Sequence, residues 1–194
     1  MQGPLQGITV ALAETRQLDL FARMLEERGA RTWRCPLVGI EDTPDREHVE
    51  DWLAMVCDHG LDWLVLLTGE GLRRLVGFAE RCDRRAAFLE RRAGARKLTR
   101  GPKPGRALRE LDLRADIPAD KPTTEGVIAT LEREALVDCR MGVQLYGEPN
   151  PRLMDYLEQR GARVLPVAPY VYTDAAEDTR VAALVDGLAA GEVD

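Results

Sequence analysis

The sequence has few of the residues that build metal and redox sites. It contains two histidines, His48 and His59, in 194 residues, and no H-E-x-x-H pattern. These numbers exclude a histidine-rich metal site. The four cysteines are Cys35, Cys57, Cys82 and Cys139, and none lies in a C-x-x-C pair. Because zinc ribbons and redox motifs need paired cysteines, we expect free thiols in a reducing compartment.

Long apolar runs and a leader sequence are also missing. No apolar segment approaches the ~20 residues of a transmembrane helix. The first residues, Met-Gln-Gly-Pro-Leu-Gln-Gly, have neither the basic region nor the apolar core of a signal peptide. Lysine is scarce, and 33 acidic residues against 27 basic ones give a net charge of −6, which is not typical of nucleic-acid-binding chains. We therefore expect a cytoplasmic protein with no membrane or nucleic-acid partner.

Hydrophobic residues make up 45% of the chain and follow two alternating periods. Residues 63–68 form an apolar run that is typical of a strand covered on both faces. Residues 45–59 place Val49, Trp52 and Val56 on one helical face. Further strands are expected at 7–13, 31–40, 97–100, 141–146 and 162–167. Further helices are expected at 17–28, 71–81, 104–111, 123–136, 151–160 and 177–190, and a very basic helical stretch follows the second of these to about Arg92. This alternation predicts an α/β fold with parallel sheets.

A short internal repeat indicates duplication. Residues 25–31, Leu-Glu-Glu-Arg-Gly-Ala-Arg, recur 132 residues later as Leu-Glu-Gln-Arg-Gly-Ala-Arg at 157–163. Both copies follow a predicted strand and helix and lead into a strand that contains a proline, Pro36 or Pro166. The agreement predicts two flavodoxin-like parallel-sheet domains related by the repeat. The second copy stops opposite Asp62, so we expect roughly 70 further residues after Asp194, the alternative being a natural variant that ends there.

The candidate binding site lies where predicted strands or loops lead into helices. The sequence has no nucleophilic triad, phosphate-binding loop or dinucleotide fingerprint. Junctions of this kind occur at 68–71, 101–105, 123–126 and 147–151. A helix start exposes backbone N–H groups and the positive end of the helix dipole, which suits a carboxylate or phosphate. Each junction also has a structural interpretation, as a turn or an N-cap.

The order of short motifs resembles that of one enzyme family. In chain order the motifs are Glu14-Thr15-Arg16, Gly29-Ala30, Pro36-Leu37, Leu67-Thr68-Gly69, Gly101-Pro102-Lys103-Pro104, Pro122-Thr123-Thr124-Glu125-Gly126, Tyr146-Gly147-Glu148, and either Pro169-Tyr170 or Val171-Tyr172. Together they resemble the uroporphyrinogen-III synthase family over essentially the whole chain. No single motif is specific, and the order and spacing carry the resemblance.

The resemblance implies two α/β domains joined by two linker strands, with the active site in the cleft. Residues 1–38 plus 171–194 would form a discontinuous first domain, incomplete at its C-terminus, and 41–168 the second. The family closes hydroxymethylbilane, a linear tetrapyrrole with eight carboxylates, to uroporphyrinogen III with inversion of ring D. It does so in tetrapyrrole biosynthesis without a cofactor, and the resemblance suggests a monomer.

The resemblance also implies site residues. Tyr170 would act on the leaving hydroxyl as a hydrogen-bond or proton donor, with Tyr172 as the alternative two residues on. Tyrosine packing at the linker is the structural interpretation of either. The expected substrate-binding residues are Arg16, Thr68, Gly69, Gly101, Lys103, Thr123, Thr124, Gly147 and Tyr172.

Three positions depart from the family pattern. Gly69 replaces a serine, Pro104 replaces a threonine, and Val171 replaces an arginine that often follows the tyrosine. These departures leave two alternatives to the enzyme. One is a non-catalytic domain of the same family that binds a tetrapyrrole or small anion within a transcriptional regulator. The other is a small-molecule sensor related by fold alone.

Overall fold

The computed structural model describes residues 3–15 and 17–194. Arg16, one of the expected substrate-binding residues, therefore lies outside the described residues. The chain forms two compact units. Unit 1 combines the chain up to Glu41 with Tyr172–Asp194, and unit 2 is Asp42–Val171. In the part of the chain that is described, no helix combines the length and apolar character needed to cross a membrane.

Unit 2 is built on a parallel sheet of five strands, as the alternating pattern predicts. The strand order is β6-β5-β4-β7-β8, and every neighbouring pair is parallel. The strands are β4 (Trp63–Leu66), β5 (Arg96–Thr99), β6 (Ile117–Pro118), β7 (Arg140–Gln144) and β8 (Arg163–Val167). The helices are α2 (Arg46–His59), α3 (Gly69–Arg81), α4 (Arg85–Gly94), α5 (Pro102–Arg109), α6 (Thr124–Leu131) and α7 (Pro151–Gln159).

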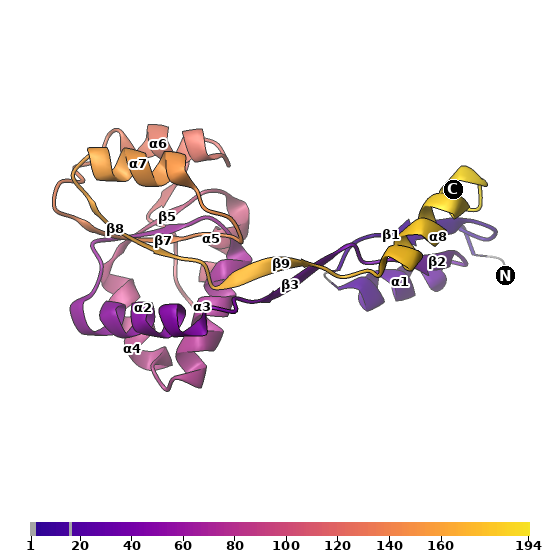
Figure 1. The fold of residues 1–194 in the computed structure, drawn as a ribbon, viewed down its shortest axis with the longest axis horizontal. Helices are drawn as coiled ribbons and strands as arrows, with labels where there is room; N and C mark the ends of the chain where they lie inside the picture. The colour runs from indigo at the N-terminus through magenta and orange to yellow at the C-terminus, as the bar shows by residue number, and fades with distance from the viewer. Residues whose placement is uncertain (1–2, 16) are drawn as a thin grey trace. The chain divides into compact units, whose positions relative to one another are not determined.

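Helices cover both faces of this sheet (Figure 1). On β4, Leu64 and Leu66 face a core shared with α2, α3, α4 and α5. Trp63 and Val65 face the opposite core, which α6 and α7 complete. Because alternate residues of a strand point to opposite faces, a strand covered on both sides must be apolar throughout. All four residues of β4 are buried accordingly.

The strand order reverses at β4. Along the chain, β5 and β6 are added on one side of β4, and β7 and β8 on the other. Numbered along the chain from β4, the order is 3-2-1-4-5, which differs from the flavodoxin-like order 2-1-3-4-5 predicted from the sequence. The reversal separates the connections after β4 and β7, which leaves room at the carboxyl ends of these two strands.

Unit 1 contains fewer strands. β1 (Thr9–Leu12) and β2 (Arg31–Arg34) form a parallel pair, with helices α1 (Leu18–Glu26) and α8 (Asp178–Ala189) in the same unit. β3 (Val38–Asp42) pairs with β9 (Tyr170–Asp174), and the boundaries between the units fall within these two strands. The first residue of β9 lies 132 positions after the first residue of β3, and the same holds for their last residues, which is the spacing of the sequence repeat. The duplication itself stays a prediction.

Helices α3 and α5 each begin two residues earlier than predicted, and three further elements differ more. The single strand expected at 31–40 is two strands, because residues 35–37 belong to no strand and Pro36 has no N–H to donate to a ladder. The two-residue strand β6 was not expected, since it is too short to show a period. Helix α6 ends at Leu131 rather than near Leu136, and beyond it Glu134 pairs with Arg96 at 2.5 Å.

Lys97 of β5 is a buried cation, only 6% exposed. Its ammonium group donates to the Ala95 carbonyl at 2.7 Å and pairs with Asp116 Oδ2 at 2.8 Å. Partial burial raises the pKa of Asp116, but hydrogen bonds from the Lys97 ammonium and backbone N–H outweigh it. The net result is a pKa of Asp116 below its usual value.

Asp116→Asn is expected to lower the free energy of unfolding at pH 7 by about 2 kcal/mol, because a buried ammonium group loses its carboxylate. The figure is below that of a fully buried pair because the Asp116 side chain is 46% exposed. The pKa of Asp116 is lower in the folded protein than in the unfolded chain, where it is about 3.9, so the ionised carboxylate stabilises the fold above that pH. This contribution disappears as the pH falls through the folded-state pKa. Urea unfolding from pH 7 to pH 3 should show the difference from wild type shrinking below about pH 4. Asp112→Asn, at an exposed acid, is the control, and a pH-independent difference would exclude the ionic role.

Candidate functional site

The candidate site lies at the carboxyl ends of β4 and β7, where the strand order reverses. Thr68 follows β4 and is the N-cap of α3, and Gln144 is the last residue of β7. Ligands of open α/β sheets bind at such a reversal. The two residues are bonded to each other, since the Thr68 backbone N–H donates to Gln144 Oε1 at 3.0 Å.

The Thr68 hydroxyl is fully used by protein groups. It accepts hydrogen bonds from the Gly71 N–H at 3.0 Å and from the Tyr170 hydroxyl at 3.2 Å. It lies 3.4 Å from Gln144 Oε1, to which it donates. A hydroxyl has one donor and two acceptor positions, so none remains for a substrate in this conformation. Thr68 therefore orders the turn, and the N–H groups of Gly69 and Glu70 in the first turn of α3 are the groups it leaves available.

Gln144 is a polar side chain with no exposed surface. Besides its bonds to Thr68, its amide donates to the Leu145 carbonyl. Gly71 makes the approach possible, because a Cβ at that position would overlap the Gln144 amide. Gln144 is not among the site residues predicted from the sequence, although a glutamine at the end of the apolar strand β7 is a visible signal.

The two candidate tyrosines have different surroundings. Tyr170 begins β9, lies in unit 2 and is fully buried. Its bond to Thr68 joins β9 to the turn between β4 and α3. Tyr172 lies in unit 1 and is 48% exposed. The structure therefore brings Tyr170 to the strand ends of unit 2.

The turns after β4 and β5 touch each other. A Cβ at Gly69 would lie 2.7 Å from the Lys103 carbonyl oxygen in the first turn of α5. A Cβ at Gly101 would lie 3.1 Å from Pro122, in the segment before α6. This close approach explains why position 69 is a glycine, because the start of α5 leaves no space for the side chain of the serine in the family pattern.

The start of α6 joins the same edge of the sheet. The Thr123 hydroxyl caps the helix by accepting from the Gly126 N–H at 3.1 Å. The Thr124 hydroxyl accepts from Asn150, the N-cap of α7, at 3.0 Å. The pKa of Glu125 is lowered by its own backbone N–H, the Thr123 hydroxyl and Arg152.

Gly126→Ala is expected to lower the free energy of unfolding by about 2 kcal/mol, because the new Cβ would overlap the backbone of Lys121. Gly105→Ala in α5 is the matched control. Nothing lies within 4 Å of a Cβ there, so the higher helix propensity of alanine should raise stability by about 0.5 to 1 kcal/mol. Urea unfolding of both variants measures the contrast. Equal effects would mean that the start of α6 can relax.

The structure thus collects most of the expected site residues in unit 2. Those at or beside the carboxyl ends of the strands are Thr68, Gly69, Gly101, Lys103, Thr123, Thr124, Gly147 and Tyr170. Gly147 has a left-handed φ of 64° and follows Tyr146, over whose ring the Arg100 guanidinium lies at 4.4 Å. Lys103 is exposed on the first turn of α5. Within the described residues, no group of histidine, cysteine, aspartate and glutamate side chains could hold a metal ion.

Comparison with known proteins identifies similar chains. The family model described as uroporphyrinogen-III synthase HemD matches residues 19–194. A Bacillus subtilis (strain 168) protein called uncharacterized protein YjjA is 33% identical over 175 residues, which is 90% of this chain and 64% of that protein. This chain therefore spans less than two thirds of that relative's length.

Solved structures of uroporphyrinogen III synthase from the extremely thermophilic bacterium Thermus thermophilus are similar too. A mutant form has a TM-score of 0.70 and 29% identity, over 97% of this chain and 71% of that one. The wild-type protein in a second crystal form has a TM-score of 0.59 and 29% identity, over 97% of this chain and 70% of its own.

Proposed function

Because the chain belongs to the uroporphyrinogen-III synthase family, we propose that it acts in converting hydroxymethylbilane to uroporphyrinogen III. The observation that carries the proposal is the likeness to the Thermus thermophilus enzyme over 97% of this chain. The reaction expels the terminal hydroxyl, inverts ring D through a spiro intermediate and closes the macrocycle. It needs no cofactor. The monomeric state, the cytoplasmic location and the division into two domains are part of the same proposal.

The main requirement of this reaction is that the protein holds the reactive linear tetrapyrrole in one conformation. Hydroxymethylbilane cyclises unaided to the wrong isomer, so fixing its conformation is a large part of catalysis. The helix starts of unit 2 suit this task. In α3 the third amide is already capped by Thr68, which leaves the first two amides for carboxylate oxygens. In α6 Thr123 caps the third amide and the Glu125 carboxylate accepts from the second, which leaves the first amide. The net charge of −6 is unfavourable for an octa-anion at long range, so these local donors must dominate.

Tyr170 is the residue that we propose for the leaving hydroxyl, as hydrogen-bond or proton donor. Its own hydroxyl already lies at the strand ends, where it donates to Thr68. Because Tyr170 is fully buried, the role requires that substrate binding releases the phenol from Thr68. Tyr172, which belongs to the other unit, is not proposed for this step.

The experiment supplies the 194-residue chain with freshly made hydroxymethylbilane and separates the type I and type III products by chromatography. An excess of type III over a reaction without protein is expected. Type I alone, at the uncatalysed rate, from a folded protein would overturn the proposal. Tetrapyrrole binding without turnover would then favour the non-catalytic member of the family.

A further inference from the structure

A pocket of about 660 Å³ opens beside the carboxyl ends of β5 and β6. Its walls come from the end of β5, helix α5 and the segments on either side of β6. Prolines and alanines make up much of the lining, which also includes Arg100, Arg109 and Arg114. The volume lies within the range of small-molecule sites.

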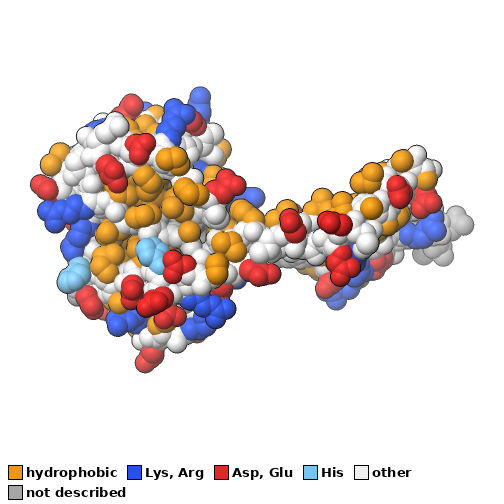
Figure 2. All heavy atoms as spheres, in the orientation of Figure 1, with side chains coloured by type: hydrophobic (Ala, Val, Ile, Leu, Met, Phe, Trp, Pro, Cys, Tyr) orange, Lys and Arg blue, Asp and Glu red, His pale blue; other side chains and the backbone are white. Residues whose placement is uncertain are grey.

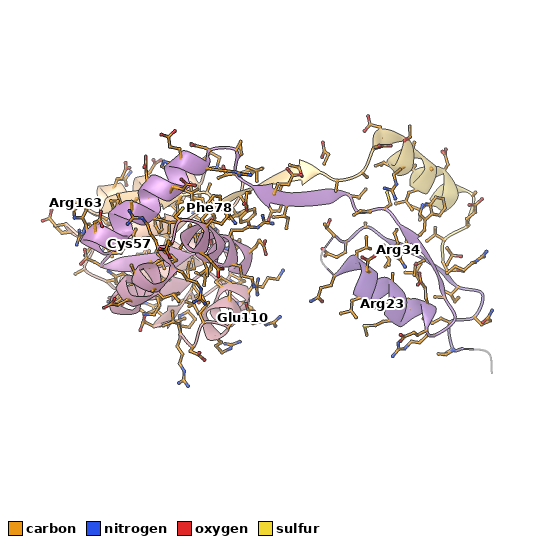
Figure 3. All side chains as sticks on the ribbon, turned by 90° about the horizontal axis from the view of Figure 1, so that it is seen from below. Arg23, Arg34, Cys57, Phe78, Glu110 and Arg163 are labelled. Atoms are coloured by element: carbon orange, nitrogen blue, oxygen red, sulfur yellow. The ribbon has the colours of Figure 1, made fainter. Side chains whose placement is uncertain are left out.

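The positive charge of this pocket is not balanced by its own lining, which contains no acidic residue. Three neighbouring acids, Glu110, Asp116 and Asp120, are paired elsewhere. Glu110, labelled in Figure 3, accepts from Arg73 at 2.8 and 2.7 Å. Asp116 pairs with Lys97, and Asp120 pairs with Arg133, each at 2.8 Å.

This local excess contrasts with the rest of unit 2. Acidic and basic side chains are interspersed over the face of unit 2 that Figure 2 shows. Arg100 lies over the Tyr146 ring, and no ion pair within the described residues involves Arg109 or Arg114. Three like charges around one pocket of an acidic protein repel one another, and an anion would relieve the repulsion.

The sequence of α5 explains why side chains would supply the charge here. Pro102 and Pro104 occupy the first and third positions of the helix. Proline has no N–H, so this helix start offers fewer backbone donors than those of α3 and α6. An anion beside α5 therefore depends more on side chains, and guanidinium groups hold carboxylates in two-point contacts.

We propose that this pocket binds one carboxylate-bearing pyrrole ring of the substrate, with Arg109 and Arg114 each holding one of its two acidic arms. The proposal rests on the proposed function for the identity of the ring. The proline and alanine walls would contact the ring itself. Arg100 would stay on Tyr146 at the mouth of the pocket.

Uroporphyrin, a fluorescent octacarboxylate, is the probe for a binding test on the 194-residue chain. The double variant Arg109→Gln with Arg114→Gln is expected to bind it about tenfold more weakly, since two charged contacts partly exposed to water are lost. The matched control is Arg106→Gln with Arg85→Gln, two exposed arginines outside the pocket. This control removes the same net charge and should change the Kd less than twofold. Circular dichroism of each variant establishes that it is folded.

Equal weakening by both double variants, or no binding by the wild type, would overturn the pocket proposal. The failure of the proposed function can be distinguished from the failure of the pocket proposal. If the chain makes no type III product but still binds uroporphyrin through Arg109 and Arg114, the pocket stands and the enzyme does not. If the chain is active and the pocket variants change neither KM nor Kd, the enzyme stands and the pocket does not.

Discussion

Tyr170→Phe is expected to lower the rate of type III product formation about a hundredfold, which is the low end for removal of a positioned proton donor. The ring and its packing are kept, and only the hydroxyl that lies 3.2 Å from Thr68 Oγ1 is lost. The same change removes one buried hydrogen bond, so the free energy of unfolding should fall by only about 1 kcal/mol. A large loss of rate with a small loss of stability would therefore identify a chemical role.

Tyr172→Phe is the matched control, two residues along the same strand and half exposed. Its rate should stay within about twofold of wild type, since the proton-donor role is proposed for Tyr170 and the Tyr172 side chain is half exposed. Initial rates of the type III product, separated from type I, measure both variants. If Tyr170→Phe keeps the wild-type rate, the phenol only anchors β9 to Thr68, and the role proposed for it is wrong.

Gln144→Leu is expected to lower the free energy of unfolding by about 3 kcal/mol, although the two side chains are similar in size. The substitution leaves the Thr68 N–H and the Leu145 carbonyl without the partners that Gln144 provides. Each buried polar group that loses its partner costs about 1 to 3 kcal/mol. Because Thr68 caps α3, the turn at the reversal point should become less ordered, and activity should fall more than tenfold.

Gln159→Leu is the control for this substitution, at an exposed glutamine at the end of α7. It should change stability by less than about 0.5 kcal/mol. Urea unfolding measures the stability of both variants, and the product assay measures their rates. A stable, active Gln144→Leu variant would show that the network at the reversal point is dispensable.

Much of the fold could be predicted from the period of the apolar residues. Trp63–Leu66 is buried on both faces, and such a run has few alternatives to a central parallel strand. The sequence predicts the start of α3 two residues late, because glycine is an unusual first residue for a helix. The cap that fixes the start at Gly69 is the hydrogen bond from the Gly71 N–H to the Thr68 hydroxyl. Strand β6 has two residues and no period at all.

The candidate site could be predicted only in part. Glycines, prolines and threonines at strand-to-helix junctions are local signals, and they led to Thr68, Gly101 and Thr123. Gln144 and Tyr170 meet at Thr68 from segments 76 and 102 residues away. A local sequence pattern does not indicate which distant segments contact each other in the fold.

The sequence by itself determined the class of fold, the parallel pairing and the positions of most helix starts, because these follow from local period and capping. The tertiary structure alone decided which helix starts lie together, which tyrosine reaches them and where the positive charge gathers. Arg109 and Arg114 are ordinary surface arginines in the sequence. They share a pocket only because α5 and the segment before β6 fold against the end of β5. Glu110, Asp116 and Asp120, which lie nearby in the sequence, pair with other cations.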